Sequence, residues 1–348
     1  MPNNPGPMAE LHRQAGVALN PMGAPLKYGP VAAAYRAAHD SAIIVDQGRI
    51  GVVDLVGKDV RRWSNGMFTQ NFRDAKVGSS LHSGWCDDRG RLQGLFQAAL
   101  LADDHIRIVL GDTSADAFVE HFDRYVLVDD VEFYQPEMAV FSAMGPRAVH
   151  GLGAVGLHPK TGELINHAND ITLLPSVRAL VSCTDVVVPL DRATDLWKSL
   201  VAAGMFAAAM AVGEVLRVES GTIRFGVDSA AKALPHELAL RDHILSFEKG
   251  CYVGQETINR LDVMGKARKG LAGVISDAPM TTGDSVFVGD KAVGTVTSPV
   301  LSPRFGHIAL SVVRKPYDQG ETVRIGETGQ GRTCPVPFPV AETPFPAF

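Results

Sequence analysis

The sequence predicts an α+β fold that ends in a small β-barrel. Between residues 27 and 265, segments with helical spacing are mixed with short apolar strands in a loosely repeated order. Beyond Lys266 the pattern changes to short alternating strands separated by glycines, which is typical of a small barrel. The chain has 348 residues, of which 46% are hydrophobic and 20% charged, a balance that suits a globular protein with a sizeable core.

The N-terminal half is predicted to begin with a loosely attached leader over residues 1–26, because five prolines interrupt its periodicity. Two strands are expected around a Gln47-Gly48 turn, and three more should form an antiparallel meander between residues 79 and 111. Helices are expected at 30–40, 58–69 and 111–126, the last with Asp112 and Thr113 as cap candidates.

The second half alternates in the same loose way before it reaches the barrel. Proline near the start of 145–153 favours a helix there, since the first turn needs no amide hydrogen. Further strands are expected at 131–135, 138–145 and 177–189, and further helices at 191–204 and 207–221. The predicted organisation is a region over 27–265 that contains two interleaved subdomains, a barrel over 266–330 and a proline-rich tail over 331–348.

Composition excludes several classes of protein. A net charge of -5 gives no overall field for binding nucleic acid or an anionic membrane, and no apolar run is long enough to span a bilayer. The cysteines are far apart and form no CxxC pair, so neither a structural metal site nor a disulfide framework is expected. We therefore expect a monomeric cytoplasmic protein with free thiols and no metal.

The segment KGCYVGQE, residues 249–256, is the most unusual stretch of the chain. Glycines at 250 and 254 allow a sharp turn, and from Gln255 onward the pattern is helical. Lys249 and the helix N-terminus would both favour the thiolate form of Cys251, which predicts a reactive cysteine. The alternative is a structural turn in which Cys251 is a small buried hydrophobic residue.

KGCYVGQE resembles the KGC[FY]xGQE signature of the YgfZ-type folate-binding proteins, relatives of the glycine-cleavage T-protein. The resemblance covers roughly residues 27–330 and includes WSNGMFTQNFRD, EVLRVESG with the following IRFGVD, and VGTVTSPVLSPRFGHIAL. It implies the three-part T-protein fold, with tetrahydrofolate bound in a channel near its centre. It also implies a role in supporting iron-sulfur enzymes and, through one of them, tRNA modification.

Glu219, in RVESG, matches the family position that recognises the pterin ring. A pterin presents two adjacent N–H donors, and one buried carboxylate can accept both, although a glutamate near a helix end is also commonly a solvated charge. The resemblance assigns Cys251 and Lys249 to the reactive site. The residues assigned to folate binding are Glu219, Arg217, Tyr252, Gln255, Glu256, Arg260, Lys266 and Arg268.

A cluster of positive charge follows the signature. Arg260, Lys266, Arg268 and Lys269 lie within ten residues and could bind the anionic glutamate tail of a folate. The alternative is a solvated basic linker before the barrel.

Two departures from the T-protein pattern argue against aminomethyl transfer. T-proteins carry an acidic pair in a GGxxDD-like segment, whereas the matching stretch here, residues 90–95, is GRLQGL. Asp87 and Asp88 lie just upstream, but a hairpin turn also favours such residues. At 45–50, VDQGRI replaces a DxSHMG-like segment.

The function predicted from these observations is folate-dependent support of iron-sulfur cluster assembly or repair, with folate and iron-sulfur client proteins as partners. A tetrahydrofolate-dependent aminomethyltransferase and a non-catalytic folate-binding module remain alternatives, so the sequence leaves open whether the protein is an enzyme.

Overall fold

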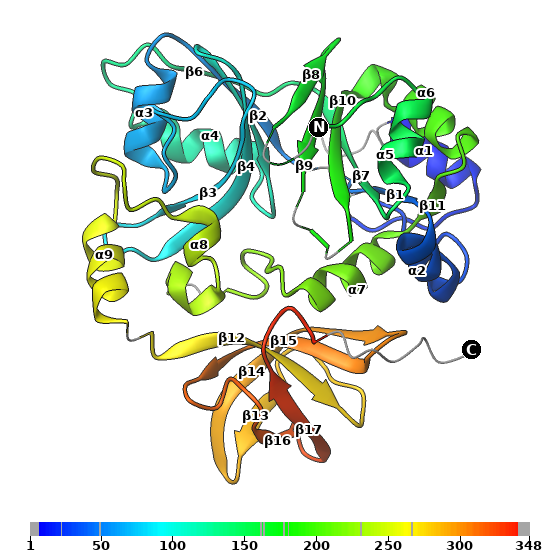
Figure 1. Ribbon diagram of the computed structural model, residues 1–348, viewed down its shortest axis with the longest axis vertical. Coiled ribbons are helices and arrows are strands. Elements are labelled where there is room, and N and C mark those ends of the chain that lie inside the picture. The colour runs from blue at the N-terminus through cyan, green and yellow to red at the C-terminus, as the bar shows by residue number, and fades with distance from the viewer. Residues whose placement is uncertain are drawn as a thin grey trace. The chain divides into compact units, whose positions relative to one another are not determined.

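The structure is a computed structural model that describes residues 7–339, other than residues 22, 49, 161, 163, 177, 180, 230, 231 and 266. The chain forms two compact units (Figure 1). Unit 1 is made from residues within 1–66, 71–82 and 96–213, and unit 2 from residues within 67–70, 83–95 and 214–348. The α+β class and the C-terminal barrel predicted from the sequence are both confirmed.

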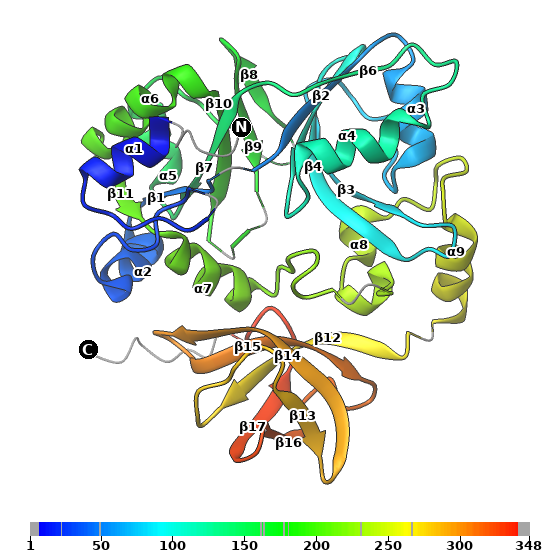
Figure 2. The same ribbon diagram turned by 180° about the vertical axis from the view of Figure 1, so that it is seen from behind.

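Unit 1 contains a six-stranded mixed sheet. Its strands are, in order across the sheet, β11 (Phe206–Ala208), β1 (Ile43–Asp46), β7 (Met138–Met144), β10 (Cys183–Pro189), β9 (Ile171–Pro175) and β8 (Asn166–Ala168). Helices α1 (Pro7–Gln14), α5 (Ala148–Ala154) and α6 (Leu190–Ala202) lie along one face of this sheet (Figure 2). Trp197 of α6, Leu152 of α5 and Met8 of α1 share one buried core with Ile44 and Phe141 of the sheet.

A five-stranded sheet follows the order β3 (Ser80–Cys86), β4 (Leu92–Ala102), β5 (His105–Leu110), β2 (Val52–Val56) and β6 (Glu132–Tyr134). The predicted meander of β3, β4 and β5 is confirmed. Helices α3 (Val60–Met67) and α4 (Ala115–Asp123) carry the aromatic rings of Trp63 and Phe122, whose centroids lie 5.7 Å apart. Val109 of this sheet packs with Val140 and Val187 of the other, so the two sheets share a core.

The two strands predicted around Gln47-Gly48 do form, but they do not pair with each other. β1 pairs with β7 and β11, whereas β2 pairs with β5 and β6. All residues of β1 are buried, as expected for a strand covered on both faces. The turn is fixed locally, because the Gly48 N–H donates to Oδ1 of Asp46 at 2.8 Å.

Part of the expected leader belongs to the core of unit 1. Helix α1 and the 31–40 helix, α2 (Val31–Asp40), are both ordered elements of this unit. His12 is fully buried, and its two ring nitrogens lie 2.8 Å from an Asp46 carboxylate oxygen and 2.5 Å from the Tyr28 hydroxyl. The expectation of a loose attachment was therefore wrong. The prolines interrupt the periodicity, but the segment between them still packs Met8 into the core and binds Asp46 and Tyr28 through His12.

The cap of α4 also differs from the prediction. Ser114, rather than Asp112 or Thr113, is the N-cap, and its side chain accepts the N–H of Ala117 at 3.2 Å. The cap therefore lies one residue after Thr113 and two after Asp112, where the serine oxygen accepts an amide hydrogen of the first turn.

Unit 2 consists of a closed six-stranded barrel and the helices that precede it. The barrel strands, in order, are β12 (Lys269–Ser276), β15 (Gly306–Arg314), β14 (Lys291–Ser302), β13 (Ser285–Val288), β16 (Thr322–Ile325) and β17 (Gly329–Cys334). The barrel thus extends four residues beyond the boundary expected at 330. The helices are α7 (Met210–Ser220), which begins in unit 1, η1 (Pro235–Leu238), α8 (Arg241–Ile244) and α9 (Gln255–Met264).

Candidate functional site

The turn that precedes α9 is built around one glycine rather than two. Gly254 has a φ of +82°, and a Cβ there would overlap the carbonyl oxygen of Asp87 in the β3–β4 turn and lie within 3.0 Å of Gly90. Gly250 has no positive φ, and a Cβ there would meet nothing within 4 Å. Close approach of two backbones therefore requires glycine at position 254, whereas the conformation at position 250 is open to other residues.

Lys249 ties this turn to a loop earlier in the chain. Its Nζ donates to the carbonyl oxygens of Phe68 at 2.5 Å and Gln70 at 2.7 Å, and it lies 4.8 Å from the centre of the Tyr252 ring. Burial lowers the pKa of Lys249 from its ordinary value of 10.5 to about 7. Among the described residues, no hydrogen bond or ion pair joins Lys249 to Cys251, so this amine positions the turn and does not contact the thiol.

Tyr252 and Gln255 form the inner side of the turn. The Tyr252 N–H donates to Oε1 of Gln255 at 3.0 Å, which fixes the turn against the start of α9. Tyr252 is 7% exposed and packs in a core with Leu92 and Ile258. Its hydroxyl is buried and has no hydrogen-bond partner among the described residues, and burial together with Cys86 raises its pKa. Tyr252 therefore belongs to the core of unit 2, and its ring is not exposed for stacking against a ligand.

Cys251 is the exposed cysteine of the chain. The other cysteines, Cys86, Cys183 and Cys334, are buried. Burial raises the pKa of Cys86 to about 12 and that of Cys334 to about 11, and it also raises the pKa of Cys183. The prediction of a reactive cysteine in KGCYVGQE requires an exposed thiol on a turn just before a helix, and Cys251 has this arrangement. Its exposure excludes the alternative of a buried structural cysteine.

Glu219 lies near the end of α7, where it is 4% exposed. Its Oε1 accepts a hydrogen bond from the Ser302 hydroxyl at 2.5 Å, and its main-chain carbonyl accepts the Phe338 N–H at 2.9 Å. The structure therefore contains a buried carboxylate at the position that the resemblance assigns to pterin recognition, and the alternative of a solvated charge does not hold.

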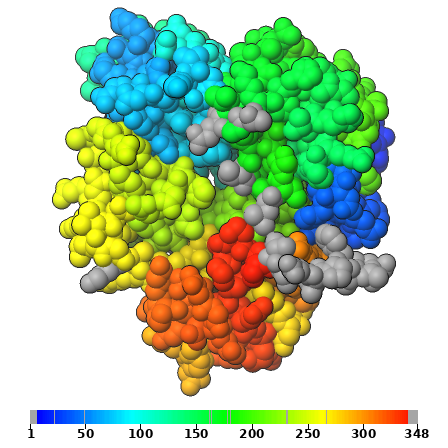
Figure 3. Space-filling view, in the orientation of Figure 1, coloured from blue at the N-terminus to red at the C-terminus, as the bar shows by residue number. Residues whose placement is uncertain are grey.

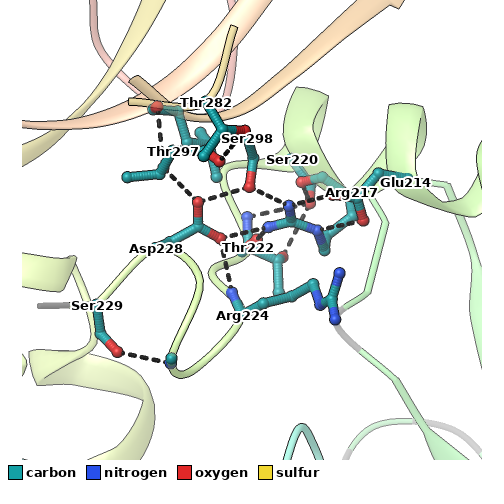
Figure 4. A network of polar contacts seen from close by, with 12 residues as sticks. Glu214, Arg217, Ser220, Thr222, Arg224, Asp228, Ser229, Thr282, Thr297 and Ser298 are labelled. Carbon is teal, nitrogen blue, oxygen red and sulfur yellow. Dashed lines mark hydrogen bonds and ion pairs between the residues drawn. The ribbon is translucent and has the colours of Figure 1, made fainter. Parts of the chain in front are cut away.

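Arg217 is the centre of a buried polar network (Figure 4). Its guanidinium donates to both carboxylate oxygens of Glu214 at 2.9 and 2.6 Å and to Oδ2 of Asp228 at 2.9 Å. It also donates to the Ser298 hydroxyl at 2.7 Å and to the Thr222 carbonyl at 2.5 Å. Since its donors are engaged in this way, direct contact between Arg217 and folate would require breaking the network; Arg217 instead stabilises the end of α7, two residues before Glu219.

The remaining residues assigned to folate binding lie on or after α9. Glu256, Arg260 and Arg268 are exposed, and Figure 3 shows the segment around α9, in yellow, open on the face drawn. Lys266 lies outside the described residues. The two exposed arginines are available to an anionic ligand, and a solvated basic linker would present them in the same way.

The β3–β4 turn engages the carboxylate of Asp87, which lies just upstream of the segment that matches the T-protein acidic pair. Oδ1 of Asp87 accepts the N–H groups of Arg89 and Arg91, both at 2.9 Å, while Asp88 is exposed. At Gly94, a Cβ would overlap the indole ring of Trp85, which is 4% exposed. The space beside β4 in which the T-protein pattern places a carboxylate is therefore filled by an aromatic ring.

Sequence reasoning missed Ser302, Trp85 and the anchoring role of Lys249. Ser302 is separated from Glu219 by 83 positions and follows a strand pattern, so no local signal links the two. No group of three or more metal-binding side chains occurs among the described residues. Within the same part of the chain, no helix is both long and apolar enough to cross a membrane.

Two family models match this chain. The GCVT N-terminal domain matches residues 9–160, and the glycine cleavage T-protein C-terminal barrel domain matches residues 269–345. A putative chloroplastic transferase of Arabidopsis thaliana is 23% identical over 317 residues, which cover 88% of this chain and 73% of that protein. An aminomethyltransferase of Thermosipho melanesiensis is 22% identical over 318 residues, 86% of each chain.

The fold is also that of a solved structure. The glycine cleavage system aminomethyltransferase T from Bartonella henselae superposes with a TM-score of 0.87 over 94% of this chain and 96% of its own, at 19% identity. The T-protein-like fold expected from the resemblance is thereby confirmed.

Proposed function

Because this chain carries both the N-terminal domain and the C-terminal barrel domain of the glycine cleavage T-protein superfamily, we propose that it binds tetrahydrofolate and acts as a YgfZ-type protein in iron-sulfur cluster assembly or repair. The observation that carries this proposal is the exposed Cys251 on a turn that is held by the buried Tyr252 and by hydrogen bonds of Lys249 and Gln255. An effect on tRNA modification would follow indirectly, through an iron-sulfur enzyme that performs it.

The donor and acceptor pattern at Glu219 suits a pterin. A carboxylate accepts hydrogen bonds and donates none, while the pterin edge offers two adjacent N–H groups. Glu219 is buried on unit 2, where water competes weakly for its oxygens. The exposed Arg260 and Arg268 would attract the glutamate tail of the folate.

Cys251 supplies the chemistry that a purely folate-binding module would lack. Thiolates bind iron and exchange with other sulfur groups, and both reactions require solvent access. Cys251 has that access and the buried cysteines do not. Since its turn is held by Gln255 and Lys249, the thiol is presented in a defined position to a client protein.

Aminomethyl transfer to tetrahydrofolate is the second candidate, and the similarity to aminomethyltransferases favours it. The site geometry argues against it, because Trp85 fills the space at Gly94 and the carboxylate of Asp87 is used within its own turn. A transferase would need another carboxylate in that region to position the folate and the amine.

Calorimetric titration tests the folate part of the proposal. The full chain should bind tetrahydrofolate, and Glu219→Gln should weaken binding by about 2 to 4 kcal/mol, since one of the two acceptor oxygens becomes a donor and the other loses its charge. Equal affinities for the two proteins would refute the assignment of Glu219.

Complementation tests the iron-sulfur part. In cells that lack this protein, wild type should restore the activity of iron-sulfur enzymes and Cys251→Ser should not, with Cys183→Ser as the matched control because Cys183 is buried. Full complementation by Cys251→Ser would overturn the proposal. Methylene transfer from an aminomethyl-lipoyl carrier protein at roughly 1 per second or faster would promote the second candidate instead.

A further inference from the structure

Ser302, the last residue of β14, makes three hydrogen bonds with one hydroxyl. The N–H groups of Arg304 and Phe305 both donate to its Oγ at 3.0 Å, and its O–H donates to Oε1 of Glu219 at 2.5 Å. Ser302 is 2% exposed, so water competes little for any of these bonds.

The hydrogen bonds of the Ser302 hydroxyl determine the direction in which its O–H bond points. A hydroxyl has one hydrogen and two lone pairs. The two backbone N–H groups use the lone pairs, so the hydrogen must point to the Glu219 carboxylate. Accepting two hydrogen bonds also polarises the O–H group and makes it a stronger donor. Ser302 therefore donates a strong hydrogen bond to the Glu219 carboxylate and restricts its rotation.

The main chain of Glu219 is held as well. The Phe338 N–H donates to the Glu219 carbonyl at 2.9 Å, and the Phe338 ring is 1% exposed and lies 5.8 Å from that of Phe305. Both the backbone and the side chain of Glu219 are thus fixed by residues of the barrel and its tail, within unit 2.

We propose that Ser302 is a positioning residue of the folate site, which holds the Glu219 carboxylate in a fixed orientation as an acceptor for the pterin edge. This inference rests on the proposed function of Glu219. A carboxylate that is ordered before the ligand arrives loses less conformational entropy on binding, so the effect of Ser302 appears as affinity.

The barrel offers a matched control for a merely structural role. Ser276 ends β12, is 9% exposed, and its Oγ accepts the N–H of Ala278 at 3.2 Å. Ser276→Ala therefore removes a similar turn contact from the same barrel without touching Glu219. If Ser302 only braces its turn, the two alanine variants should behave alike.

The experiment is calorimetric titration of the full chain with 5-formyltetrahydrofolate, a stable reduced folate, at pH 7. Ser302→Ala should bind about tenfold more weakly than wild type, because the Glu219 carboxylate is no longer held in one orientation. Ser276→Ala should match wild type. In a Glu219→Ala background, Ser302→Ala should change affinity by less than about twofold, since it acts through Glu219.

Two results would overturn the inference while leaving the proposed function intact. One is that Ser302→Ala binds as tightly as wild type while Glu219→Gln binds more weakly. The other is that Ser302→Ala loses the same affinity with and without Glu219. No binding by wild type would overturn the proposed function and this inference together.

Discussion

The indole ring of Trp85 occupies the space that a side chain at position 94 would need, so only glycine fits in β4 beside this ring. The ring is 4% exposed and belongs to the packed part of unit 2. This relationship gives a physical reason why the T-protein carboxylate is missing here, since an aspartate at position 94 would have to displace a tryptophan.

The first prediction is that Gly94→Ala destabilises the protein by about 1 to 3 kcal/mol, because even one methyl group must push the indole of Trp85 aside. Urea unfolding measures the change. Gly66→Ala is the control: Gly66 lies in α3 with nothing within 4 Å of an added Cβ, so alanine there should be neutral or stabilise by up to about 1 kcal/mol. Equal stabilities for wild type and Gly94→Ala would show that Trp85 moves freely.

The second prediction concerns the network in Figure 4. Arg217→Met should destabilise the protein by about 3 to 5 kcal/mol, because Asp228, 1% exposed, loses its cation at 2.9 Å while staying buried. The control is Arg62→Met, which breaks the ion pair between Arg62 and Asp129. Because the Arg62 side chain is 65% exposed, this substitution should lower the free energy of unfolding by less than about 1 kcal/mol. Chemical unfolding of the two variants compares them, and similar small losses would mean that the buried network contributes little.

The third prediction is a pH dependence that originates at Lys249. Burial holds its pKa at about 7 in the folded protein, below the ordinary 10.5 expected after unfolding. Between these values the unfolded chain binds a proton that the folded protein does not, so stability rises with pH across this window and the penalty for burying the ammonium is largest below pH 7.

Lys249→Met removes this titration. The free energy of unfolding of wild type relative to Lys249→Met should therefore increase by roughly 2 to 4 kcal/mol between pH 7 and pH 10. Lys58→Met should show no such trend, because the Lys58 side chain is 78% exposed. A flat difference for Lys249→Met would mean that the carbonyls of Phe68 and Gln70 keep the ammonium charged throughout.

Local patterns predicted the element types well and their long-range pairing poorly. The helix from Gln255 and the closed barrel follow from hydrophobic period and glycine spacing, which are local signals. The separation of β1 and β2 into different sheets depends on which strands cover them, and that information lies elsewhere in the chain.

The site shows the same limit. The sequence indicated Cys251 and Glu219 through motif resemblance, yet it could not show that Ser302 would meet Glu219, since the contact spans 83 positions. Lys249 was expected to favour the thiolate form of Cys251. The sequence could not show that the carbonyls of Phe68 and Gln70, which only the fold brings near, bind its amine.

The last prediction is that iodoacetamide modifies Cys251 first in the native protein. Thiolate is the reacting form, and burial holds the pKa of Cys86 at about 12 and that of Cys334 at about 11, against an ordinary 9.0. Their thiolate populations near neutral pH are therefore lower than that of an ordinary thiol by roughly a hundredfold or more, before their lack of access is considered. Peptide mass spectrometry at successive times should show modification of Cys251 alone at early times, whereas all cysteines should react in urea. Native modification of Cys86 or Cys334 at the same rate as Cys251 would mean that unit 2 opens on this timescale, and an unreactive Cys251 would remove the thiol from the proposed function.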